Sequence, residues 1–170
     1  MSSLPALPDP EALIESLIAQ LRDRVDNQVG IIGIRTGGVW VAERLCAALG
    51  VTLPPGTIDV SFYRDDFRNV GLHPGVKPSE IPFSVEDRNI LLVDDVLYTG
   101  RTVRAAINEI FDYGRPQHLW LAALVDRGGR QLPFAADAVG AILSIPDDAR
   151  VDLIRAPDGT LSLEYRAAQP

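Results

Sequence analysis

Cysteine is nearly absent from this sequence, with Cys46 as the one example among 170 residues. A single cysteine excludes a disulfide within the chain and any zinc site built from thiolates. Cys46 lies within residues 41–49, whose apolar spacing is typical of a helix. We therefore expect a small buried thiol rather than a nucleophile.

Long apolar runs are also missing, although 46% of the residues are hydrophobic. No run approaches the roughly 20 residues that a membrane-spanning helix needs. Residues 1–5 have neither the basic stretch nor the apolar core of a secretory signal. We expect a cytoplasmic protein with no membrane partner, folded as one domain over residues 1–170.

Lysine is scarce, since Lys77 is the only one in the chain. Sixteen basic residues face 23 acidic residues, which gives a formal net charge of −7 and a pI near 4.7. This balance argues against a surface that attracts nucleic acid broadly. Phosphate-rich ligands that carry a metal ion remain compatible with it.

Apolar spacing predicts alternating helices and buried strands. A helix is expected from Glu11 to about Asp26, and a second helix follows a strand at residues 29–34. Further strands are expected at residues 89–93 and 119–125, with a helix over residues 102–113 between them. This alternation predicts an α/β fold whose mainly parallel sheet is flanked by helices and carries its ligand groups at the carboxyl ends of the strands.

Two regions depart from this alternation. Residues 57–63 resemble a strand, and a flexible loop rich in proline, glycine and charge follows over about residues 62–84. Loops of this length in compact domains often act as lids. The tail, residues 138–165, predicts short strands joined by turns at residues 146–148 and 157–159.

The most informative segment is residues 90–102, in which an apolar strand meets two carboxylates and then a helix. Amides at the helix start, with the hydroxyls of Thr99 and Thr102, can surround a phosphate in the partly positive field of the helix end. Asp94 and Asp95 can accept hydrogen bonds from vicinal sugar hydroxyls. Carboxylates beside a phosphate also imply a divalent cation or a basic neighbour such as Arg101.

This segment resembles the 13-residue signature of type I phosphoribosyltransferases, which hold 5-phosphoribosyl pyrophosphate (PRPP). The resemblance implies the α/β fold of that family, with a flexible active-site loop and a small hood over the site. It also implies that one stretch, here called the signature loop, binds the ribose phosphate; its residues are Asp94, Asp95, Val96, Leu97, Tyr98, Thr99, Gly100, Arg101 and Thr102.

The likeness extends to one group in the family, the attenuation regulators of pyrimidine operons that are also uracil phosphoribosyltransferases. The matching pieces are residues 33–38, 62–66, 103–106, 114–116 and 124–133. Together with the signature they span roughly residues 30–140, which is most of the chain.

The resemblance assigns roles to further residues. Arg35, Thr36, Gly37 and Gly38 resemble the loop that binds pyrophosphate, although some members carry a basic residue where this chain has Gly37. Arg64, Asp65 and Asp66 resemble residues of the mobile flap and join Asp94 and Asp95 as expected catalytic residues. Arg127 and Val151 are expected to contact the base. Mg²⁺ is expected to bind through the substrate, with Asp94 and Asp95 as candidate ligands.

The implied reaction joins uracil to PRPP and releases UMP and pyrophosphate, as in pyrimidine salvage. Two alternatives stay open. One is an RNA-binding regulator of pyrimidine genes that senses UMP or UTP, for which the acidic balance is unfavourable. The other is a phosphoribosyltransferase for hypoxanthine, guanine, xanthine or orotate. A homodimer or higher homo-oligomer is expected in each case.

Overall fold

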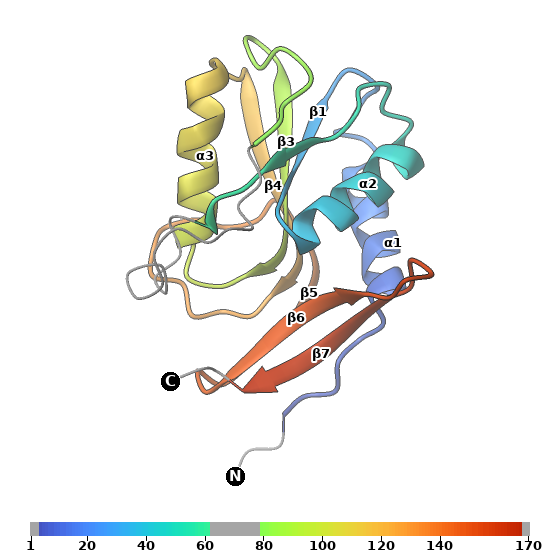
Figure 1. Ribbon diagram of the computed structural model, residues 1–170, viewed down its shortest axis with the longest axis vertical. Helices are drawn as coiled ribbons and strands as arrows, with labels where there is room; N and C mark the ends of the chain where they lie inside the picture. Colours follow the sequence, from blue (N-terminus) through green and yellow to red (C-terminus); the bar gives the residue numbers. More distant parts are fainter. Residues whose placement is uncertain (1–3, 62–78, 168–170) are drawn as a thin grey trace.

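The computed structural model describes residues 4–61 and 79–167. Five parallel strands form a sheet in the order β2-β1-β3-β4-β5, and its central strands β1, β3 and β4 lie side by side in Figure 1. Their bounds are β1 (Gly30–Ile34), β2 (Gly56–Ile58), β3 (Asn89–Leu97), β4 (His118–Asp126) and β5 (Ala138–Ile142). An antiparallel hairpin, β6 (Ala149–Arg155) and β7 (Leu161–Ala167), lies beside one end of the sheet. The hairpin occupies the place expected for the hood.

Helices cover both faces of the sheet, as the sequence predicts. α1 (Pro10–Leu21) and α2 (Gly37–Leu49) pack on one face, and α3 (Arg101–Tyr113) packs on the other. Alternate residues along each strand face opposite helices. In β3, Leu91 joins the core beneath α1 and α2, whereas Leu92 joins the core beneath α3. Among the described residues, no helix is both long enough and apolar enough to cross a membrane.

Three boundaries differ from the prediction. α1 ends at Leu21 rather than near Asp26, since residues 22–24 form a turn that still buries Val25. β3 runs on through the two aspartates to Leu97, because Val96 and Leu97 pair with β4. β2 is only three residues long, and its middle residue Thr57 forms an isolated antiparallel bridge with Glu80. The expected loop at about residues 62–84 lies mostly outside the described residues.

Cys46 lies in the core beneath α2, as expected for a packing residue. Burial, followed by the nearby Glu43 carboxylate, raises the pKa of its thiol to about 11. The side chain is therefore a protonated thiol at neutral pH, which leaves it without the thiolate that nucleophilic chemistry requires.

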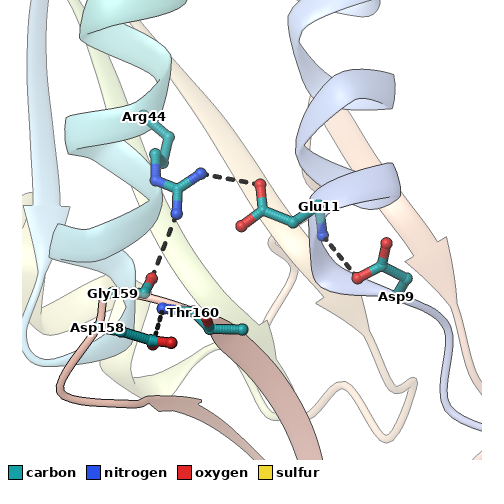
Figure 2. A network of polar contacts seen from close by, with 6 residues as sticks. All are labelled: Asp9, Glu11, Arg44, Asp158, Gly159 and Thr160. Carbon is teal, nitrogen blue, oxygen red and sulfur yellow. Dashed lines mark hydrogen bonds and ion pairs between the residues drawn. The ribbon is translucent and has the colours of Figure 1, made fainter.

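Polar contacts hold the β6–β7 hairpin against the helices. Arg44 of α2 donates to Glu11 Oε2 at 2.8 Å and to the carbonyl of Gly159 in the hairpin turn at 3.4 Å (Figure 2). The same view shows Asp9 accepting from the amide of Glu11 at the start of α1. Exposed pairs of this kind contribute about 0–1 kcal/mol each, so they orient the hairpin more than they stabilise it.

The apolar side of the hairpin supplies the stronger attachment. Val151, Leu153 and Leu161 are each 5% exposed and pack into the body of the protein. At the other end, the Tyr165 hydroxyl donates to the carbonyl of Pro5 at 2.7 Å. The hairpin is thus anchored along its length, which sets the position of β6 over the sheet.

Candidate active site

A cleft of about 620 Å³ opens at the carboxyl ends of the strands. The chain leaves β1 toward β2 on one side and later returns to β3 on the other side. Ligands of open α/β sheets bind at such a reversal of strand order. The loops after β1 and β3 both reach this point. The residues that line the cleft are Thr36, Gly37, Trp40, Asp94–Val103, Arg127, Asp147, Arg150–Ile154 and Arg166.

The whole signature loop lines the cleft. Gly100 precedes the first turn of α3, and the hydroxyl of Thr99 accepts from the amide of Arg101 at 3.2 Å. Amides in a first helical turn have no partner within their own helix. Those of Thr102 and Val103, both of which line the cleft, therefore suit an anion.

The loop after β4 supports the signature loop from behind. The carbonyl of Thr99 accepts from the amides of Gln131 and Leu132 at 2.9 and 3.0 Å. Arg130 donates to the carbonyl of Tyr98 and forms an ion pair with Asp126 at 2.6 Å. These contacts hold the signature loop in one backbone shape before any ligand binds.

The two aspartates have different surroundings. Asp94 is 5% exposed, and its Oδ1 accepts from the amide of Asp95 at 2.9 Å. Asp95 is partly exposed and lies against the start of α2, where a Cβ added to Gly37 would come within 2.3 Å of Asp95 Oδ2. Both carboxylates belong to the cleft, which they share with the amides at the start of α3.

The expected pyrophosphate loop is only partly in the cleft. Thr36 and Gly37 line the cleft. Arg35 instead donates a hydrogen bond from Nη2 to Oγ1 of Thr57 in β2 at 3.2 Å. The peptide bond between Arg35 and Thr36 is cis. A Cβ on Gly38 would lie 2.5 Å from the carbonyl oxygen of Val93, so this glycine lets α2 approach β3 rather than exposing backbone to a ligand.

Arg127 and Val151, the expected base contacts, both line the cleft. Arg127 is 6% exposed, which rules out a surface arginine. Its guanidinium lies 4.0 Å from the ring centroid of Tyr98 and donates to the carbonyls of Ala149 and Pro146 at 2.9 and 3.0 Å. Arg127 is therefore tied into the wall of the cleft.

Sequence reasoning missed several residues of the cleft. Trp40 lines it, and the Arg155 guanidinium lies 4.8 Å from the Trp40 ring centroid. Asp147 accepts from the Tyr98 hydroxyl at 3.0 Å, and this bond is the main cause of a raised pKa for the Tyr98 phenol. Arg64, Asp65 and Asp66 lie outside the described residues.

Comparisons with known proteins agree with this geometry. The model of the phosphoribosyl transferase domain matches residues 2–151. The chain is 52% identical over 161 residues to the Bifunctional protein PyrR of Nitrosococcus oceani, covering 91% of each chain. It is 48% identical over 170 residues to the protein of the same name from Pseudomonas paraeruginosa, covering 97% of this chain and 98% of the relative.

Solved structures agree with the fold. A variant of hypoxanthine phosphoribosyltransferase from Trypanosoma cruzi superposes with a TM-score of 0.63 at 26% identity, over 84% of this chain and 81% of the other. A purine phosphoribosyltransferase from Pyrococcus horikoshii gives 0.61 at 29% identity, over 79% and 83%. The chain therefore belongs to the type I phosphoribosyltransferases, and within them to the PyrR group.

Proposed function

We propose that this protein is a uracil phosphoribosyltransferase that makes UMP and pyrophosphate from uracil and PRPP with Mg²⁺, in pyrimidine salvage. One observation carries the proposal: a single cleft combines the signature loop with Thr36 and Gly37 and with the edge of β6. These three walls suit the three parts of the reaction, which are the ribose phosphate, the leaving pyrophosphate and the base.

The 5-phosphate binds at the start of α3. The amides of Thr102 and Val103 donate to it, and the hydroxyls of Thr99 and Thr102 complete the cradle. Asp94 and Asp95 accept hydrogen bonds from the ribose hydroxyls. Fixed contacts at both ends of the sugar hold its C1 carbon in line with the incoming base, which is the main contribution a protein makes to a displacement of this kind.

The residues of the cleft fit a magnesium ion that is held mainly by substrate oxygens. Within residues 4–61 and 79–167, no group of three or more acidic, histidine or cysteine side chains could hold a metal ion. Mg²⁺ commonly takes one or two protein carboxylates and completes its shell with phosphate and water, which leaves Asp94 and Asp95 as ligand candidates. When bound, it would neutralise charge on the leaving pyrophosphate.

The pyrophosphate contacts come from the loop after β1. Thr36 and Gly37 border the cleft and supply main-chain groups, whereas Arg35 contributes positive charge from its place beside Thr57. In this proposal Arg64, Asp65 and Asp66 belong to a flap that closes over the substrates. Closure would exclude water, which could otherwise trap a cation-like ribosyl transition state.

The base binds between the signature loop and β6. Strand β6 pairs with β7 along one edge, and residues 150–154 of β6 border the cleft. Main-chain groups near Val151 suit the donors and acceptors on the edge of uracil. The choice of uracil rests on likeness to PyrR proteins at about 50% identity. The solved purine-using relatives share the fold but are less similar in sequence, at 26–29% identity.

A regulatory role is the second candidate. The relatives are named bifunctional, which favours an RNA-binding regulator of pyrimidine genes that senses UMP or UTP. The net charge of −7 works against broad RNA affinity. Such a role would use a local basic surface and would not require the catalytic cleft to be altered.

A panel of bases tests the proposed function. Purified protein is mixed with PRPP, Mg²⁺ and either uracil, orotate, hypoxanthine, guanine or xanthine, and nucleotide products are separated by chromatography. We expect UMP from uracil and no product from the other bases. Product from a purine or orotate would overturn the substrate and keep the phosphoribosyl transfer. No product from any base would favour the regulator, with RNA-binding titrations as the next measurement.

A further inference from the structure

Tyr98 stands where the signature loop meets two other segments. The Arg127 guanidinium lies 4.0 Å from its ring centroid. On the loop after β4, a Cβ added to Gly129 would lie 2.4 Å from Tyr98 Cε2, so the ring packs directly on the Gly129 backbone. Its hydroxyl donates to Asp147 Oδ1 at 3.0 Å. The Tyr98 side chain is therefore held by packing against its ring carbons and by the hydrogen bond from its hydroxyl.

Arg127 connects the same ring to the segment that leads into β6. Its Nη1 donates to Ala149 at 2.9 Å, and its Nη2 donates to Pro146 at 3.0 Å and to Ile145 at 3.4 Å. Ala149 is the first residue of β6. A buried guanidinium that satisfies several carbonyls acts as a rigid support, because its planar donors are directed at fixed angles.

The engaged donors argue against direct recognition of a base by Arg127. Three of the five N–H donors of the guanidinium are bound to main-chain carbonyls, and Nε is buried with no partner among the described residues. A ligand in the cleft would have to displace existing bonds to reach these three donors. The side chain can nevertheless act on the base through the strand that it holds.

We propose that Arg127 and Tyr98 are positioning residues that set the height of the base pocket, the space between the signature loop and the start of β6. This inference rests on the proposed function, since it concerns the base side of the same cleft. Tyr98 and residues 150–154 both line the cleft. The stacked pair joins the two and so determines which bases fit between them.

Replacing Arg127 separates this role from a general structural one. For Arg127→Ala, the KM for the base should rise roughly tenfold or more, while the KM for PRPP stays within about twofold. Selectivity among the bases should fall, because the wall is no longer held at one distance. Millimolar methylguanidine should partly restore the KM for the base, since it can refill the space, whereas methylammonium should not.

The two glycines after Arg127 offer a matched pair of variants. Gly128 and Gly129 have φ angles of 74° and 71°, so alanine strains the backbone similarly at both positions. A Cβ on Gly129 would strike the Tyr98 ring, whereas one on Gly128 would meet no described atom within 4 Å. Gly129→Ala should therefore raise the KM for the base in the manner of Arg127→Ala, and Gly128→Ala should show only the effect of strain.

Two results would overturn the inference. One is an equal rise of the KM for the base and the KM for PRPP in Arg127→Ala and in Gly129→Ala. The other is an equal change in the KM for the base in Gly129→Ala and Gly128→Ala. If Arg127→Ala fails to fold, the glycine pair carries the test. The proposed function is judged separately by wild-type turnover of uracil, and the KM ratios are measured with whichever base the wild-type protein uses.

Discussion

Replacing Asp94 and Asp95 together by asparagine should lower kcat/KM for PRPP by about 10²-fold or more, since each charge-assisted hydrogen bond contributes about 1.5–3 kcal/mol. Asparagine keeps the shape of each side chain and removes its charge. Both carboxylates belong to the cleft beside the start of α3. The variant therefore loses contacts to the ribose hydroxyls and the candidate ligands for Mg²⁺, while the backbone of the signature loop keeps its supports from the loop after β4.

The control for this variant replaces an exposed aspartate of α3 that lies outside the cleft. Asp112→Asn lies on the surface of α3 and makes the same chemical change outside the cleft. Steady-state kinetics and thermal melting are measured for both proteins. We expect normal kinetics for Asp112→Asn and a folded double variant with little turnover. Near-normal kinetics in the double variant would remove the ribose contact assigned to the pair.

Gly38→Ala should destabilise the protein by about 1–3 kcal/mol, the range found for overpacked cores. Alanine in place of glycine within a helix ordinarily stabilises it by about 1 kcal/mol, so the expected sign is reversed here. A Cβ on Gly38 would lie 2.5 Å from the carbonyl oxygen of Val93 and 3.2 Å from the Cα of Asp94. Because these atoms belong to the backbone of a central strand, they cannot turn aside.

Gly37→Ala is the natural comparison, because the obstacle there is a side chain. Its Cβ would meet Asp95 Oδ2 at 2.3 Å and Asp95 Cβ at 2.9 Å, so the carboxylate can rotate away but the Asp95 Cβ must shift slightly. Urea denaturation should show a smaller loss of stability for Gly37→Ala than for Gly38→Ala. Steady-state kinetics should show a larger loss of activity for Gly37→Ala than for Gly38→Ala. Wild-type stability in Gly38→Ala would mean that α2 does not pack on β3 as closely as described.

The central part of the fold follows from local patterns in the sequence. Apolar runs at residues 29–34 and 119–125 predict β1 and β4, and the amphipathic spacing after Gly100 predicts α3. The extension of β3 through Asp94 and Asp95 could not be predicted in this way. Two aspartates disfavour a strand locally, and only pairing with β4, as in Val96 with Val125, continues the ladder.

The site was predictable where its residues are consecutive. The signature loop is one segment, so its strand, turn and helix could be recognised together. Asp147 comes from the segment just before β6 and Arg166 from β7, and their place in the cleft depends on how the hairpin packs on the body of the protein. Arg127 lines the cleft, and its bonds to the carbonyls of residues 145–149 depend on a long-range contact that no local pattern indicates.

The most direct test of the central claim is the binding of PRPP itself. Isothermal titration of PRPP with Mg²⁺ into the wild-type protein, without any base, isolates the signature loop from the question of which base is used. The loop is already supported in one shape, so we expect saturable binding with one PRPP per chain, and its loss in the double asparagine variant. No binding to the wild-type protein, or equal binding to both proteins, would contradict the account.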